Sequence, residues 1–443
     1  MAGINDHPIA LKLKSQESAP PVTITREQLR QLTLECGADD CGVVRFDEPG
    51  LEQEWDYAQR AFSGARVAVS IVCRMNHAPV RSPFRAASNN EFHQVSHEVD
   101  HVARKLVRRL TDMGISSMNP PMAFPMEFES YPERGWVISH KIIAEASGMG
   151  MRGIHRSVIH PKFGSFILLG TVLVDVEMEA KTTQIDFNPC FECRLCVVAC
   201  PVGALKPDGY FDFSACLNHN YQQFLGGFVN WVEDVADSKS SNDYQERQPL
   251  AETVKRWQSL SYGPNYNAAY CVAVCPAGED IMGHYMKDRK AHVETVLKPL
   301  QARDEVLYVV KKSDAEAHAA KMFPHKKLRY VRPSGRPTTI GSFLFGIGLS
   351  FQKGQSKGLN AVYHFHFDGA EQAKATVVIK DQKLEVTKGL VGTPNLEIHA
   401  DSDTWLRMVD GRLSPLRAMA TRKVRLKKGS PRLLLAFSAC FPK

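Results

Sequence analysis

The chain has 443 residues, 44% of them hydrophobic and 23% charged, which is ordinary for a globular protein of two to three domains. No window approaches the roughly 18 consecutive apolar residues that a membrane span requires, so we expect no transmembrane segment. The net charge of +7 is mild and much of it comes from residues 417–432. This charge gives no reason to expect a nucleic-acid partner.

The first 22 residues form a polar tail that lacks the apolar stretch of a secretory signal. We therefore expect a cytoplasmic protein. In that setting the eleven cysteines of this long chain indicate metal binding or core packing rather than a disulfide framework.

Residues 23–185 are predicted to form the first domain. Its first helix has Thr25 as N-cap and ends at Gly37, and strands follow over residues 41–46 and 66–73.

A longer periodic helix, over residues 90–113, carries His93, His97 and His101 on one stripe. These histidines could bind a metal, but the His-Glu-x-x-His order of a zinc helix is absent, which favours a polar helix face beside a pocket.

A further helix over residues 136–146 runs into Ser147-Gly148-Met149-Gly150, and a long buried strand is expected within residues 160–179. Strands and helices alternate through this region, which predicts an α/β sandwich.

Residues 186–290 contain a cysteine motif with the spacing of metal ligands, Cys190-Phe-Glu-Cys193-Arg-Leu-Cys196-Val-Val-Ala-Cys200-Pro. This C-x₂-C-x₂-C-x₃-C-P spacing is typical of bacterial ferredoxins with two clusters, in which the fourth cysteine binds the other cluster. Three more cysteines follow: Cys216, Cys271 and Cys275. The pattern predicts two iron–sulfur clusters and electron transfer, and no Rossmann or P-loop motif supplies a nucleotide site.

Residues 291–337 are rich in helix formers and charge, and they are expected to link to a separate domain over residues 338–443. Short alternating strands are predicted there over residues 360–367, 374–379, 384–386 and 396–400, with a helix after Asp403 and a solvated basic strand over residues 423–427. His364 and His366 share one strand face, and their alternation with aromatic residues favours a solvent face over a metal site.

The order of these motifs resembles that of the epoxyqueuosine reductases and reductive dehalogenases. The resemblance covers residues 25–285 and implies a nitroreductase-like α/β sandwich that binds cobalamin, with an inserted two-cluster ferredoxin-like domain. It implies cobalamin contacts for a set of residues on the glycine turn and the following loop: Gly148, Gly150, His160, Phe163, Gly164 and Ser165.

The second cysteine motif departs from the family pattern, because Ala268 stands where the relatives have its first cysteine. The resemblance then implies one complete 4Fe-4S cluster, held by Cys190, Cys193, Cys196 and Cys275. It leaves Cys200, Cys216 and Cys271 for the second cluster. That cluster is expected to be a 3Fe-4S centre, a 4Fe-4S centre with a ligand such as His219, Asn267 or Tyr270, or absent.

The catalytic acid of the relatives falls near Arg134 in this chain. We expect Tyr131 to donate the proton, with Arg134 or Lys141 stabilising a leaving anion, because a nearby cation favours the phenolate.

The C-terminal residues resemble the sterol carrier protein 2 family, through the run 357–369 and the run 389–405. This second resemblance implies an α+β domain with an apolar lipid tunnel. Phe343, Phe345, Ile347 and Leu349, with Trp405 and Leu406, are expected either to line the tunnel or to form ordinary core.

The expected fold class is α+β, and the favoured function is cobalamin-dependent reductive dehalogenation or deoxygenation of a hydrophobic small molecule. Electrons would come from a ferredoxin or flavodoxin. Two alternatives stay open: a cobalamin-free electron-transfer or sensor protein with a lipid-binding domain, and a tRNA epoxyqueuosine reductase-like enzyme.

Overall fold

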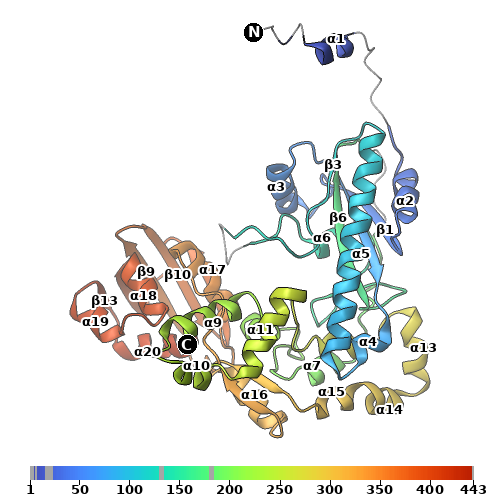
Figure 1. The fold of residues 1–443 in the computed structure, drawn as a ribbon. Coiled ribbons are helices and arrows are strands. Elements are labelled where there is room, and N and C mark those ends of the chain that lie inside the picture. The colour runs from blue at the N-terminus through green and yellow to red at the C-terminus, as the bar shows by residue number, and fades with distance from the viewer. Residues whose placement is uncertain (1–3, 5–6, 15–22, 129–133, 179–183, 442–443) are drawn as a thin grey trace.

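The computed structural model describes residues 1–443 except 1–3, 5–6, 15–22, 129–133, 179–183 and 442–443. Three parts follow one another along the chain: a sheet with a long helix, a helical segment with the cysteines, and a second sheet at the C-terminal end (Figure 1). Helix α1 (Pro8–Lys14) stands apart from them. None of the helices in the described ranges is long and apolar enough to cross a membrane.

The first sheet has the order β1-β2-β6-β3 and is antiparallel throughout. Its strands are β1 (Asp40–Arg45), β2 (Val67–Arg74), β3 (Ser117–Met118) and β6 (Ile167–Val174). The central strands are buried on both faces, because neighbouring residues alternate between two hydrophobic clusters. Val69 packs with the cluster that includes helix α5, and Ala68 packs with the cluster that includes helix α6.

Helices cover both faces of this sheet: α2 (Arg26–Glu35) and α5 (Arg85–Asp112) on one side, α3 (Glu52–Ala61) and α6 (His140–Ala146) on the other. The first helix has the predicted N-cap, since the Thr25 side chain accepts from the Gln28 amide in a capping box. The predicted start of helix α6 at Trp136 is wrong, because the helix begins only at His140. The Ser139 amide just before it donates to the Glu54 carboxylate.

The histidine stripe of α5 forms no metal group among the described residues. His93 Nε2 pairs with the Pro264 carbonyl oxygen at 2.8 Å, and His97 and His101 are exposed. The expected polar helix face is present, and the predicted pocket beside it stays a prediction.

Short helices and a hairpin surround the cysteines. The hairpin is β4 (Met151–Arg152) with β5 (Val158–Ile159), and α4 (His77–Arg81) precedes α5. The other elements are α7 (Leu195–Ala199), α8 (Phe213–Asn220), α9 (Gly226–Asp237), α10 (Ser241–Arg247), α11 (Leu250–Tyr262), α12 (Tyr270–Ala273), α13 (Glu279–Lys287), α14 (Arg289–His292), a π-helix (Val293–Leu297) and α15 (Lys298–Ala302).

Residues 291–337, expected to be a linking segment, contain a small β–α–β unit. Strands β7 (Val306–Val309) and β8 (Lys327–Tyr330) pair in parallel, and α16 (Asp314–Met322) connects them. Leu307 and Ala319 of this unit pack with Ala215 of α8 in one hydrophobic cluster. The unit therefore supports the helix that carries Cys216.

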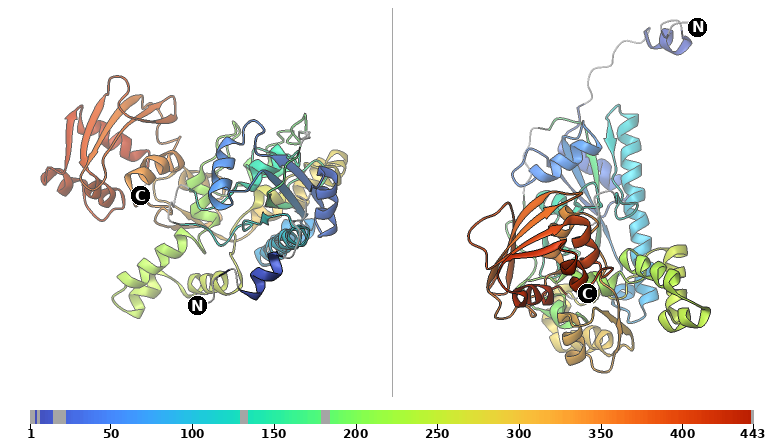
Figure 2. Two further views of the ribbon diagram at one scale, coloured as in Figure 1. Left: turned by 90° about the horizontal axis from the view of Figure 1, so that it is seen from above. Right: turned by 90° about the vertical axis from the view of Figure 1, so that its left-hand side faces the viewer.

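The C-terminal domain is a five-stranded sheet in the order β11-β10-β9-β12-β13, covered by helices (Figure 2). The strands are β9 (Ala361–Asp368), β10 (Ala373–Lys380), β11 (Lys383–Lys388), β12 (Leu396–Asp401) and β13 (Val424–Lys428). The helices are α17 (Ile340–Ser350), α18 (Ser402–Val409), α19 (Pro415–Ala420) and α20 (Pro431–Ala439).

The aromatic residues of this domain fill its interior. Phe343 contacts Phe365, Phe367 and Trp405, with ring centroids between 5.6 and 6.2 Å apart. Of the remaining residues considered for a tunnel lining, Ile347 and Leu406 are buried in the same cluster, whereas Phe345 is 46% exposed. Of the two alternatives left open by the sequence, tunnel lining and ordinary core, these contacts agree with ordinary core.

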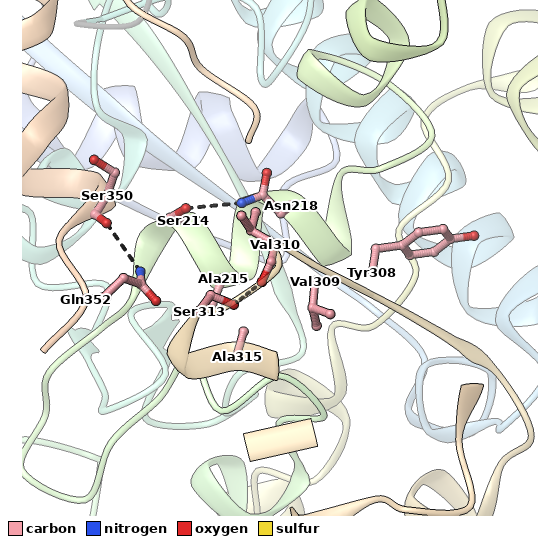
Figure 3. A pocket seen from close by; sticks show the side chains of 10 residues that line it. All are labelled: Ser214, Ala215, Asn218, Tyr308, Val309, Val310, Ser313, Ala315, Ser350 and Gln352. Carbon is pink, nitrogen blue, oxygen red and sulfur yellow. Dashed lines mark hydrogen bonds between the residues drawn. The ribbon is translucent and has the colours of Figure 1, made fainter. Parts of the chain in front are cut away.

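Gln352 joins the C-terminal domain to the cysteine segment. It is 2% exposed, its Nε2 donates to the Asp212 carboxylate at 3.3 Å, and its Oε1 accepts from the Asp314 amide at 2.9 Å. A hollow lies at this joint, with Ser350 and Gln352 on one side and α8, β7 and α16 on the others (Figure 3). Asp212 is the N-cap of α8, so the joint touches the start of the helix that bears Cys216.

Asp212 gives the joint a pH dependence. Burial raises the pKa of its carboxyl to about 6, whereas the unfolded chain has an ordinary value near 3.9. The native state therefore holds more protons between about pH 4 and pH 6, and stability falls as pH rises through that range, by at most about 3 kcal/mol. Asp212→Asn keeps an N-cap acceptor and should flatten this slope, raising the urea midpoint at pH 7 relative to wild type. A variant that keeps the wild-type slope between pH 4 and pH 7 would contradict the assignment.

Candidate iron–sulfur site

Four cysteines from two distant segments line one hollow: Cys190, Cys193, Cys196 and Cys275. These are the four residues that the resemblance implies for the complete cluster. Buried thiols prefer to be neutral, and burial raises the pKa of the Cys275 thiol to about 11. A metal centre bound here displaces those protons.

The spacing of the sulfur atoms discriminates between a cluster and a single ion. Zinc–thiolate bonds of about 2.3 Å place tetrahedral sulfurs about 3.8 Å apart. Among the residues that the structure describes, no three cysteine sulfurs lie within 4.8 Å of one another. The arrangement of the sulfurs therefore gives no support to a single tetrahedral ion.

Several residues beside the cysteines have left-handed backbone conformations. Glu192 and Arg194, which flank Cys193, have φ values of 54° and 62°, and Ala269 has a φ of 62° two residues before Cys271. Left-handed backbone is uncommon for residues other than glycine and persists where the surroundings impose it. Such strain at both motifs supports a functional role for these loops.

The other three cysteines form a second group. The Cys200 and Cys271 sulfurs lie close enough to Cys216 to raise the pKa of its thiol further, after burial itself. The Ala204 amide donates to Cys200 Sγ at 3.2 Å. Amide hydrogens directed at sulfur are a recurring means of tuning iron–sulfur centres.

Ala268 lies beside this second group. It is 8% exposed and its amide donates to Asn220 Oδ1 at 2.9 Å, at the end of the helix that carries Cys216. Position 268, where the resemblance implies a cysteine, is therefore held against helix α8, which carries Cys216.

The residues considered as a substitute ligand are all engaged elsewhere. The Tyr270 hydroxyl contacts Glu305 at 2.8 Å, and the Asn267 amide donates to the His219 carbonyl at 2.8 Å. His219 Nδ1 accepts from the Tyr308 amide at 3.3 Å, so its buried Nε2 carries the hydrogen and offers no lone pair. These contacts disfavour a fourth protein ligand from this set.

Part of the segment expected to contact cobalamin packs against the second cysteine motif. A Cβ at Gly164 would meet the Ala277 carbonyl oxygen at 2.0 Å, and its φ is +65°. Ser165 Oγ donates to the Val272 carbonyl at 3.1 Å, three residues before Cys275. Gly164 and Ser165 therefore hold the segment that carries Cys275.

His160 and Phe163 are buried and stack with centroids 4.7 Å apart. His160 Nε2 pairs with Asp40 at 3.1 Å, and its Nδ1 accepts from the Lys162 amide at 3.1 Å. These contacts join the loop to strand β1 and favour a structural role for both residues.

The glycine turn after α6 requires glycine for steric reasons. Gly148 has a φ of 80° and Gly150 a φ of 147°, and a Cβ at Gly150 would meet the Ile159 carbonyl oxygen at 2.3 Å. Farther along, a Cβ at Gly153 would lie 3.4 Å from Cys190 Sγ. The turn thus brings the β4–β5 hairpin against the first cysteine of the motif.

Two of the three expected catalytic residues, Arg134 and Lys141, lie in the described part of the chain. Tyr131 lies outside the described residues. Arg134 forms a two-point ion pair with Glu54, at 3.1 and 2.6 Å, and its guanidinium stacks over Tyr57. This buried pair favours a structural role for Arg134 at the start of α6 over the expected catalytic one.

Lys141 is the expected catalytic residue that lies near the second cysteine group. Its Nζ donates to the Arg156 carbonyl at 3.1 Å, and desolvation lowers the pKa of the ammonium while the Cys271 and Cys216 sulfurs raise it. Tyr221 lies in the same region: burial raises the pKa of its phenol well above the ordinary value, and Cys216 and Cys271 contribute. Sequence reasoning missed Tyr221, because only the fold brings it to Cys271.

His155 is a second residue that sequence reasoning missed. It lines the hollow of the first cluster, is 6% exposed, and has no partner for Nε2. Its Nδ1 accepts from the Ser157 amide at 3.1 Å, so Nε2 carries the hydrogen. This N–H is available to a cluster sulfur.

We expect His155→Phe to make the reduction potential of the first cluster more negative, by tens of millivolts, because a donor to sulfur stabilises the reduced state. The measurement is a redox titration followed by EPR. His93→Phe, remote from the hollow, serves as control and should leave the potential unchanged. Equal potentials in wild type and His155→Phe would show that the N–H does not reach the cluster.

Known families match two parts of the chain. The 4Fe-4S binding domain matches residues 183–206, and the SCP-2 sterol transfer family matches residues 350–442. The first match covers the cysteine run around the hollow, and the second covers nearly the whole C-terminal domain.

Curated relatives match longer stretches of the chain than these two families do. Epoxyqueuosine reductase of Listeria monocytogenes is 25% identical over 298 residues, which is 64% of this chain and 66% of that protein. The Vibrio cholerae enzyme of the same name is 25% identical over 45% of this chain and 59% of that protein. The chain is related to the epoxyqueuosine reductases, and it carries an SCP-2-like domain at its C-terminal end. It spans less than two thirds of the length of these relatives.

Among solved structures, epoxyqueuosine reductase from Streptococcus thermophilus matches 44% of this chain and 57% of that chain, with a TM-score of 0.34 and 18% identity. The catabolic reductive dehalogenase NpRdhA matches 68% of this chain and 35% of that chain, with a TM-score of 0.38 and 15% identity.

Proposed function

We propose that the chain is an iron–sulfur oxidoreductase that acts as an epoxyqueuosine reductase-type enzyme. The main support is that one hollow is lined by Cys190, Cys193, Cys196 and Cys275. The curated relatives of the chain are named epoxyqueuosine reductase. The relatives favour this alternative over the dehalogenation expected from the sequence. The substrate would be reduced at an epoxide of a modified tRNA base. A nucleic acid would then be a partner, contrary to the expectation from the net charge.

For the second cluster we propose a three-iron centre held by Cys200, Cys216 and Cys271. Its support is the engagement of His219, Asn267 and Tyr270 in other contacts. Electrons would enter from a ferredoxin or flavodoxin and pass between the two centres, since Cys196 and Cys275 of one group lie within electrostatic range of Cys271 of the other.

A corrinoid bound near the second cluster would supply a strongly reducing cobalt centre. In that proposal the nitroreductase-like sheet and its helices hold the cofactor, and the residues of this chain handle the proton. Tyr221 keeps its phenolic proton at neutral pH, because burial raises its pKa. Lys141 supplies an exposed cation for the developing anion.

Two measurements test the function. Anaerobically purified protein is analysed for iron, sulfide and corrinoid, with added hydroxocobalamin, and the chain is expressed in a strain deficient in epoxyqueuosine reductase to look for restored queuosine. Corrinoid binding with restored queuosine supports the proposal. Corrinoid binding without queuosine would shift the assignment to another substrate, and failure to bind any corrinoid would leave a cobalamin-free electron-transfer or sensor protein.

A second candidate function is reductive dehalogenation or deoxygenation of a hydrophobic small molecule. The SCP-2 match over residues 350–442 favours it, because that domain is joined through Gln352 to the cap of the helix that bears Cys216. Reduction of a halogenated or oxygenated apolar compound by the corrinoid-loaded protein, in the absence of tRNA, would support this candidate.

A further inference from the structure

Three metal-ligating side chains gather on the outer face of the C-terminal sheet. Strands β9 and β12 are parallel neighbours, and their register sets His366 directly beside His399. Glu397 precedes His399 by two residues and so projects from the same face. His366 Nε2 lies 3.4 Å from Glu397 Oε1, and His399 Nε2 lies 2.9 Å from the same oxygen. All three ligand atoms lie within 4.8 Å of one another.

These separations suit one small cation. Zinc bonds to imidazole nitrogen and carboxylate oxygen of about 2.0–2.2 Å place tetrahedral ligand atoms about 3.3–3.6 Å apart. The two imidazole rings are stacked, with centroids 4.1 Å apart and planes 17° from parallel, so both nitrogens already face the carboxylate. Little rearrangement is needed to bring the three atoms around one ion.

The donor set selects the class of metal. Two imidazoles and one carboxylate suit first-row divalent transition metals, whereas calcium and magnesium prefer oxygen ligands.

The neighbours on this face are mostly basic. The strand register sets Lys374 beside His366, Arg425 beside His399, and both His364 and Lys428 beside Glu397. The three cations are exposed and on long stems, so they can turn away from a bound ion. His364 Nε2 is held by the Val391 carbonyl at 3.0 Å and is not one of the three ligands.

We propose that His366, Glu397 and His399 bind one divalent transition-metal ion, with Zn²⁺ as the expected occupant. The site lies in the SCP-2-like domain, is built from strands β9 and β12, and does not depend on the iron–sulfur function. With three protein ligands it keeps at least one position open, as do catalytic rather than structural zinc sites. The open position would accept an anionic group, and the basic neighbours favour such a ligand.

The test uses the full chain with its iron–sulfur clusters in place, so that free cysteines do not compete for metal. Protein is dialysed anaerobically against Zn²⁺, freed of unbound ion by gel filtration, and analysed for zinc per chain, and the affinity is measured by calorimetry. The expected result is one zinc per chain in wild type, and binding weakened by more than about tenfold in His366→Gln and in Glu397→Gln.

The matched control is His364→Gln, on the same strand and face, which should retain wild-type zinc binding. Circular dichroism of each variant checks the fold. As a second readout, Cu²⁺ bound to wild type should give an EPR spectrum with splitting from two imidazole nitrogens, and His399→Gln should lose one of them. Zinc binding that is equal in wild type and in the double variant H366Q/H399Q, or absent from wild type, would overturn the proposal.

Discussion

Replacing Ala268 with cysteine should raise the iron content of the protein from about seven to about eight atoms per chain and remove the EPR signal of an oxidised three-iron cluster. The reason is positional: the Ala268 amide is held by Asn220, on the helix that carries Cys216, so a new thiol there meets the second cysteine group. The measurements are iron and sulfide analysis and EPR of the oxidised protein.

Ala269→Cys is the matched control, because it introduces the same side chain one residue further along. It should leave iron content and the EPR signal as in wild type. A wild-type protein that already holds eight irons without a three-iron signal would refute the three-thiolate cluster. An Ala268→Cys protein with unchanged iron would show that position 268 does not face the second centre.

Removing a ligand of the first cluster should have the largest effect on function. Cys196→Ala takes one of four thiolates from the enclosed hollow, and we expect the loss of about four irons per chain and of all reduction that depends on an external electron donor. Iron analysis, visible absorbance and donor-dependent turnover measure the change.

Cys73→Ala is the control, since Cys73 is fully buried in strand β2 and belongs to neither cysteine group. It should keep both clusters and their absorbance, at a modest cost in stability from the lost packing. A Cys196→Ala protein that retains four irons in the first site would mean that another residue replaces the thiolate, and the assignment of ligands would be wrong.

Local patterns in the sequence were sufficient for much of the fold. Strands β9 to β12 start and end within two residues of the predicted ranges, because apolar and polar residues alternate along most of each strand. The N-cap at Thr25 was equally local. The β7–α16–β8 unit was missed, because its strands have only four residues each and charged residues surround them.

The site was predictable where ligands follow from spacing and unpredictable where they follow from packing. The cysteine run identifies its own ligands. Gly164 and Ser165 were expected at a cofactor, and only the folded chain reveals that they press against the segment that holds Cys275. His155 carries no motif at all, and its significance arises from a missing hydrogen-bond partner inside the hollow.

The contact between Gly164 and Ala277 also bears on how the protein matures. Three ligands of the first cluster come from one short loop, but Cys275 arrives from a segment that is seated by Gly164, Ser165 and the backbone of Pro161, whose carbonyl accepts from the Glu279 amide at 2.9 Å. These contacts can form only after strand β6 and the loop before it have folded. We therefore expect insertion of the first cluster to follow closure of the first domain, because before that closure the chain could offer only three of the four thiolates.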